Sequence, residues 1–128
     1  MNRCALLVTA LVAATLAPNL AQAQAHRQFP ATALRGELLV VAPPEVRLNG
    51  RLAQLAPGAR IRGADNLMQL SGSLAGQRVL VHYTLDLQGS LQDVWVLNAT
   101  ERANQPWPVT PQQAAGWTFD PAAQRWSK

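Results

Sequence analysis

The sequence predicts an all-β fold: a small barrel or sandwich of six to eight short strands, with a Pro/Trp-rich C-terminal tail packed on it. Two observations support this prediction. Between residues 36 and 99, short runs of β-forming residues alternate with turn-forming Gly, Pro and Asn. After residue 100, four prolines exclude a long helix. Residues 36–128 are therefore expected to form a single β domain, in which residues 100–128 are the aromatic tail.

The first half of the domain is expected to begin with a hairpin. Residues 24–35 show no hydrophobic period and are interpreted as an extended N-terminal lead-in. A strand over 37–41 ends before Pro43-Pro44, and a strand over 45–48 runs into Asn49-Gly50, a dipeptide that favours a two-residue hairpin turn. The following strands are expected over 51–55, 59–62 and 66–70, with a turn at Pro57-Gly58 and a small-residue connection over 71–76.

The most apolar strand pair is expected at the centre of the fold. Residues 79–86 are rich in β-formers, Gln88-Gly89 lies in the turn, and residues 91–97 form the return strand. Residues 79–97 resemble a hairpin of the TonB C-terminal domain: a hydrophobic strand, an Asp, a Gly-containing turn, then Asp-Val-hydrophobic-Val-Leu. That resemblance supports the hairpin. The whole chain also resembles small uncharacterised secreted proteins of Gram-negative bacteria, which implies a compartment and no activity.

The tail combines a short helical turn with a strand pair. Residues 111–115 are expected to form one helical turn, with Thr110 as its cap and Gly116 as its stop. Trp117 to Phe119, Asp120-Pro121 and Arg125-Trp126 then indicate strand, turn and strand. Large aromatic rings dock irregular segments onto a core because each buries a large area, so the tail is expected to be ordered.

Residues 1–23 have the three parts of a secretory signal peptide. Arg3 supplies the positive start, an uncharged apolar run extends from Cys4 to Ala17, and small residues precede a cleavage site between Ala23 and Gln24, with cleavage after Ala25 as the alternative. The apolar run is shorter than the ~20 residues that span a bilayer. The expected localisation is periplasmic or secreted, with no membrane span in the mature chain.

Export also limits the chemistry of the domain. The single cysteine, Cys4, lies in the signal peptide, so the mature chain has no disulfide and no thiolate. His82 would share a strand face with Thr84 and Asp86, and Asp93 or Trp95 would join them across the hairpin. Because a metal centre needs more ligands than this set offers, His82 is interpreted as structural, and no cofactor or metal is expected.

Two groups of residues are candidates for a ligand or partner surface. Flat aromatic rings stack on sugars, and clustered arginines attract anionic envelope material, whereas nucleic-acid binding is disfavoured because acidic residues lie among the arginines and no aromatic residues interleave with them. The candidates are Trp107, Trp117, Trp126, Arg47, Arg51, Arg60 and Arg62.

The sequence favours a non-enzymatic function. It contains no nucleophile elbow, phosphate loop or paired-carboxylate motif. The first hypothesis is an accessory or binding protein of the cell envelope, whose partner is another envelope protein or an anionic envelope component. The second is a carbohydrate-binding module that uses the tail tryptophans, and the third is a small enzyme. The ligand, the pathway and the oligomeric state are open at this level.

Overall fold

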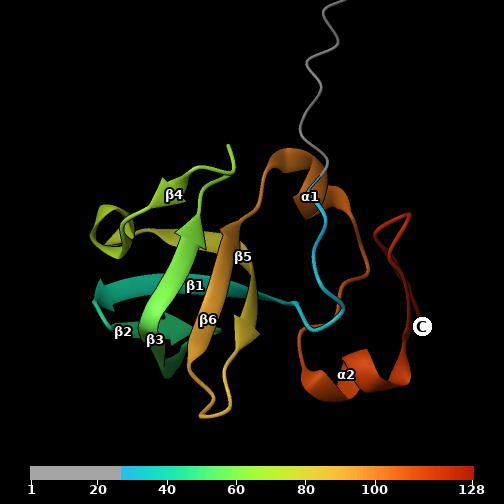
Figure 1. The fold of residues 1–128 in the computed structure, drawn as a ribbon, viewed down its shortest axis with the longest axis horizontal. Helices are drawn as coiled ribbons and strands as arrows, with labels where there is room; N and C mark the ends of the chain where they lie inside the picture. Colours follow the sequence, from blue (N-terminus) through green and yellow to red (C-terminus); the bar gives the residue numbers. More distant parts are fainter. Residues whose placement is uncertain (1–26) are drawn as a thin grey trace, which may run out of the picture.

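A computed structural model describes residues 27–128 of the chain. The expected signal peptide, its cleavage site and His26 lie outside the described residues. Within them, strands dominate and the helices are short, so the predicted all-β fold is confirmed. Figure 1 shows a β-barrel on one side and the C-terminal tail on the other, with the segment after residue 27 running between them.

Five strands close the barrel: β1 (Leu34–Ala42), β2 (Glu45–Leu48), β3 (Arg51–Arg62), β5 (Arg78–Leu85) and β6 (Leu91–Val96). Strand β1 pairs with β2 and β5, whereas β3 pairs antiparallel with β2 and parallel with β6. The antiparallel β5–β6 hairpin completes the ring. This connectivity is a Greek key, in which β5 returns to lie beside β1 after the consecutive strands β1, β2 and β3.

The turn expected at Pro57-Gly58 is wrong, because β3 continues through it as one strand. The first half of β3 pairs with β2 and the second half with β6, and the register with β6 shifts between Leu55 and Arg60. Gly58 has a φ of +75°, which bulged or bent strands take at glycine. Pro57 and Gly58 therefore bend β3 so that it leaves β2 and pairs with β6, and they do not end the strand. The Asn49-Gly50 turn is confirmed, with both residues at positive φ.

The connection between β3 and β5 closes one part of the barrel. The strand expected over residues 66–70 is reduced to β4 (Met68–Gln69), which pairs with the end of β3. The small-residue connection contains the 3₁₀-helix η1 (Ser71–Leu74). Leu74 is buried in the barrel core, so this connection contributes to packing.

Side-chain alternation on β5 separates two cores. Val81 and Tyr83 point into the barrel, and His82 points to its outer surface. The tail and the N-terminal segment cover His82 there. The barrel core consists of Leu34, Leu38, Val40, Val46, Leu55, Ile61, Leu74, Val81, Tyr83, Leu91 and Val94.

The tail contains α1 (Ala99–Ala103), α2 (Pro111–Gly116) and a two-stranded sheet of β7 (Thr118–Asp120) and β8 (Arg125–Ser127). The cap expected at Thr110 is confirmed, because its side chain accepts a hydrogen bond from the Gln113 backbone. Helix α1 was not expected from the sequence.

An aromatic second core joins this tail to the barrel. Phe29, Ala33, Leu97, Trp107 and Trp126 are buried in it, and the indole Nε1 of Trp107 donates to the Ala33 carbonyl at 3.0 Å. The N-terminal lead-in is part of this core, and β1 begins at Leu34, so the last two residues of the expected lead-in belong to a strand. The expectation that the Pro/Trp-rich tail packs on the barrel is confirmed.

Candidate ligand pocket

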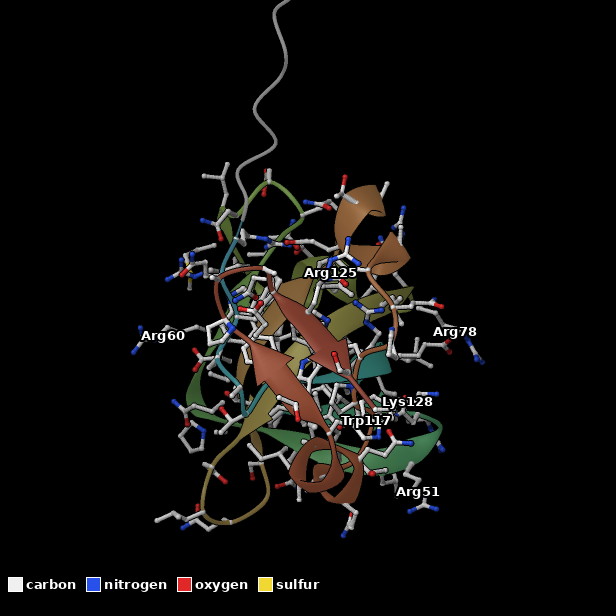
Figure 2. The ribbon with its side chains drawn as sticks, turned by 90° about the vertical axis from the view of Figure 1, so that its right-hand side faces the viewer. Arg51, Arg60, Arg78, Trp117, Arg125 and Lys128 are labelled. Carbon is white, nitrogen blue, oxygen red and sulfur yellow. The ribbon has the colours of Figure 1, made fainter. Side chains whose placement is uncertain are left out.

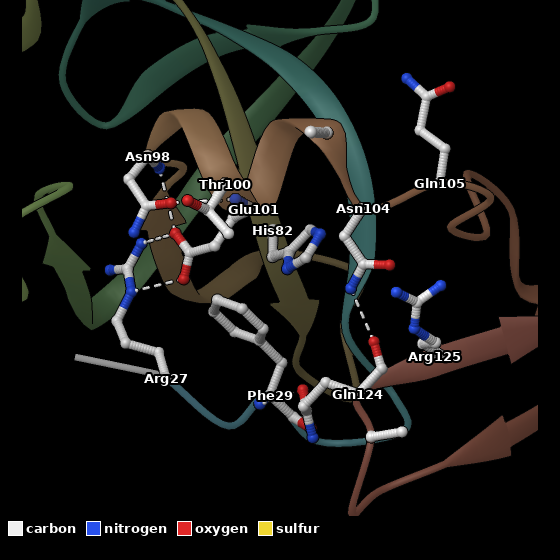
Figure 3. Close-up of a pocket in the computed structure, with 12 residues that line it drawn as sticks. Arg27, Phe29, His82, Asn98, Thr100, Glu101, Asn104, Gln105, Gln124 and Arg125 are labelled. Atoms are coloured by element: carbon white, nitrogen blue, oxygen red, sulfur yellow. Dashed lines mark hydrogen bonds and ion pairs between the residues drawn. The ribbon is translucent and has the colours of Figure 1, made fainter. Parts of the chain in front are cut away.

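A pocket of about 370 Å³ lies where α1, the N-terminal segment and the β7–β8 turn meet. Its volume is at the small end of the range for small-molecule sites, ~300–1,000 Å³. Figure 3 shows Arg27 and Glu101 at one side, Asn104 and Arg125 at the other, and His82 between them.

Arg27 and Glu101 form a paired wall of the pocket. The guanidinium makes two contacts with the carboxylate, of which the Nε–Oε2 hydrogen bond measures 2.9 Å. Arg27 also donates to the carbonyls of Gly63 and Val96. Glu101 closes the capping box of α1, since it accepts from the Asn98 backbone while Asn98 accepts from the Glu101 backbone. Both side chains are therefore fixed by the fold.

The floor of the pocket is organised by Arg35 and His82. Arg35 is buried and donates to the Nε2 atom of His82 from its Nε at 3.2 Å and from one NH₂ group at 3.1 Å. It also donates to the carbonyls of Glu101 and Asn104, at 2.8 and 2.9 Å. An arginine has no acceptor, so Nε2 must hold a lone pair, and the hydrogen of the neutral ring is on Nδ1.

The His82 ring is packed between aromatic side chains. It stacks on Trp107 with a centroid separation of 4.1 Å and meets the edge of Phe29 at 4.4 Å. Burial, followed by the positive charges of Arg35 and Arg27, lowers the pKa of His82 from 6.5 to about 2. His82 is 1% exposed, and within residues 27–128 its Nδ1 atom has no hydrogen-bond partner.

The opposite wall comes from the end of α1 and the β7–β8 turn. The Asn104 side chain donates to the Gln124 carbonyl, and the Gln124 side chain accepts from the Phe29 backbone. Arg125, at the start of β8, is exposed, and its guanidinium forms no ion pair with any residue that the structure describes. Asp120 lies opposite Arg125 in the sheet, but its Oδ1 accepts from the backbone of the turn.

The sequence favours docking of the tail tryptophans over their use as a binding platform, and the structure agrees for Trp107 and Trp126. Trp107 and Trp126 are 4% and 6% exposed, because their rings fill the second core. Trp117 is half-buried, and the Lys128 ammonium lies over its ring at 5.3 Å. The candidate ligand surface at Trp107 and Trp126 is therefore wrong, because burying these large apolar rings in the second core leaves almost none of their area exposed.

The four arginines expected as one basic patch lie in separate places. Arg47 and Arg51 belong to the β2–β3 hairpin, whereas Arg60 and Arg62 lie on the other half of β3, beside β6. In Figure 2, Arg51 and Arg60 are on opposite sides of the molecule. The bend in β3 is the physical reason, since it carries the two pairs to different faces. Arg60 also lies next to Asp93 in the parallel ladder.

The constellation of His82, Asp86 and Asp93 is not assembled. Asp86 accepts from the backbone of its own turn, and Asp93 contacts Thr84, whereas His82 pairs with Trp95 in the ladder. In the part of the chain that the structure describes, no three His, Cys, Asp or Glu residues are placed to hold a metal ion.

Four residues of the site were not predicted from the sequence: Arg27, Arg35, Glu101 and Arg125. One signal was present: Asn98 and Glu101 have the spacing of a capping box, which would have placed a helix start there. The arginines carried no signal, because their neighbours come from segments far apart in the chain.

Comparison of the chain with protein-family models, with curated proteins and with solved structures finds no match. Among residues 27–128, every helix is too short or too polar to cross a bilayer.

Proposed function

We propose that this protein is an exported, non-enzymatic binding protein of the cell envelope, and that the pocket between α1 and the β7–β8 turn is its binding site. The observation that carries the proposal is the floor of this pocket. There, a buried histidine is held in one orientation by Arg35 and two aromatic rings, while its Nδ1 donor has no protein partner in the described chain.

An unsatisfied buried donor has an energetic cost, and that cost favours a ligand role for this site. Leaving a buried N–H without an acceptor costs ~1–3 kcal/mol. His82 lines the pocket, so a ligand that displaces the side chains covering Nδ1 can supply the acceptor and recover this energy. The surrounding walls are rigid, because Arg27, Glu101 and Asn104 are each fixed by hydrogen bonds to other segments.

The same geometry favours binding over catalysis. A general base near neutral pH needs a pKa close to 7, whereas the pKa of His82 is lowered to about 2. The Glu101 carboxylate is occupied by Arg27 and by the helix cap. The pocket therefore presents fixed donors and does not present a side chain ready to exchange protons.

A pair of neighbouring alanines tests the pocket. Ala123 lines it, and Ala122, the preceding exposed residue of the same turn, does not. An envelope small-molecule extract is incubated with the wild-type protein, with Ala123→Trp and with Ala122→Trp, and retained compounds are identified by mass spectrometry. The proposal expects retention by the wild type and by Ala122→Trp, and loss in Ala123→Trp. Equal retention by all three proteins, or by none, would contradict it.

Export is tested separately. The intact mass of protein recovered from the periplasm or medium is expected to correspond to a chain that begins at Gln24. A recovered species that retains residues 1–17 would contradict soluble export.

A further inference from the structure

Charge is unevenly distributed around the pocket. Three guanidinium groups, those of Arg27, Arg35 and Arg125, lie in or beside it, and Glu101 is the carboxylate among its lining residues. Arg27 forms an ion pair with that carboxylate. Arg35 contacts Glu101 only through the backbone carbonyl, so its buried charge has no carboxylate in direct contact within residues 27–128. Burial lowers the pKa of Arg35, and the negative charge of Glu101 opposes that shift.

The charges of Arg27 and Arg35 lie on side chains that are largely buried. Buried and half-buried charges are screened less than surface charges, so the positive potential extends into the pocket. Arg125 stands on the rim opposite Arg27, and its exposed guanidinium can present two parallel donors to a planar anion. At the floor, the Nδ1 atom of His82 has less than 1 Å² of exposed area, so its N–H becomes a further donor when a ligand displaces the side chains that cover it. That N–H is polarised because Nε2 accepts from a cation.

We propose that the ligand is a small molecule held by an anionic oxygen group, a carboxylate or a phosphate, with Arg125 at the rim and the His82 Nδ1–H at the floor as donors. This inference rests on the proposed binding function and adds the chemical class of the ligand. A volume of about 370 Å³ fits a headgroup and a short substituent, and the Phe29 ring gives the pocket one apolar wall.

Matched probes test the charge of the ligand. N-acetylglycine carries a carboxylate, N-acetylglycinamide has the same skeleton without the charge, and inorganic phosphate represents the alternative source of the anionic oxygens. Each is titrated into ¹⁵N-labelled protein, and backbone amide shifts are followed at Asn104 and Arg125. The carboxylate or the phosphate is expected to shift these amides with saturation, and the neutral amide is expected to bind about tenfold more weakly or not at all. The anion that binds more tightly identifies whether the ligand's anionic group is a carboxylate or a phosphate.

A matched pair of arginines tests the donor. Arg125 lines the pocket, whereas Arg102 is an exposed arginine of α1 that does not. Arg125→Gln is expected to weaken anion binding about tenfold, and Arg102→Gln to leave it within about twofold. Both positions are exposed, so both variants are expected to fold.

Two results separate failure of this inference from failure of the binding function. If extract compounds bind in the pocket but the neutral amide binds as well as the carboxylate, or Arg125→Gln has no effect, the anionic class is wrong and the binding site stands. If neither anion shifts the pocket amides, the inference is also wrong. If Ala123→Trp retains the extract compounds as the wild type does, or if none of the proteins retains any, the proposed binding site itself is wrong.

Discussion

The Nε2 atom of His82 accepts two hydrogen bonds from the Arg35 guanidinium, at 3.2 and 3.1 Å. This contact places a permanent cation against a titratable ring. Protonation of Nε2 would replace the two hydrogen bonds with repulsion, in a place already shielded from water by Phe29 and Trp107. The contact therefore fixes both the charge and the tautomer of His82, and it links β1 to β5 beneath the pocket.

The first prediction is an acid-dependent loss of stability that depends on His82. An unfolded histidine binds a proton near pH 6.5, whereas the folded pKa is lowered to about 2. Between these two values the unfolded state holds one more proton, so the free energy of unfolding falls as pH falls, by ~1.4 kcal/mol per pH unit. Urea unfolding at pH 7 and pH 5 is expected to show a loss of about 2 kcal/mol from this group.

His82→Gln provides the reference for this measurement. Because it lacks the titrating ring, subtracting its pH dependence removes the contributions of the carboxylates and of the other histidine. If the wild type and His82→Gln lose the same free energy of unfolding between pH 7 and pH 5, the prediction is wrong. His82 would then have an ordinary pKa in the folded protein.

The second prediction concerns the tail tryptophans. Trp126 is buried against Trp107 and Phe119, with ring centroids 6.1 and 4.8 Å away, whereas Trp117 is half-buried at the edge. Trp126→Ala is expected to reduce the free energy of unfolding by ~3–5 kcal/mol, as other large-to-small core changes do. Trp117→Ala is expected to cost clearly less, as measured by chemical denaturation. Equal effects, or a wild-type-like Trp126→Ala, would mean that the tail is not part of the core.

The third prediction compares the barrel interior with the hairpin tip. Val81 is fully buried in the barrel core, and Leu87 is fully exposed in the β5–β6 turn. Val81→Asp would bury an unpaired charge and is expected to cost several kcal/mol. Leu87→Asp is expected to change the melting temperature little. A Val81→Asp protein that melts like the wild type would place Val81 at the surface and overturn the proposed barrel interior.

Local patterns in the sequence predicted most of the strands. The Asn49-Gly50 turn and the Thr110 cap are determined by residues close in the chain, and both were predicted correctly. The Pro57-Gly58 bend was mistaken for a turn, because this dipeptide occurs both in turns and in bent strands. Which of the two forms depends on the strands that pair on either side of it.

The candidate site was much less predictable. Its parts come from the N-terminal segment, β5, α1 and the β7–β8 turn, so the pairing of Arg27 with Glu101 joins residues 74 positions apart. No local pattern encodes such a contact. The tryptophans were visible in the sequence, but composition does not tell whether a ring is buried or exposed, and the fold buries Trp107 and Trp126.

The central claim is that His82, oriented by Arg35 at the floor of the pocket, is neutral and carries its hydrogen on Nδ1. Long-range ¹H–¹⁵N correlation spectra of the histidine ring report which nitrogen carries the hydrogen, with Arg35→Met as the variant that removes the partner cation. We expect the hydrogen on Nδ1 in the wild type from about pH 8 to pH 4, and an Nδ1–H resonance that moves when N-acetylglycine is added. A ring that carries its hydrogen on Nε2, or that becomes protonated between about pH 5 and pH 7, would contradict the account.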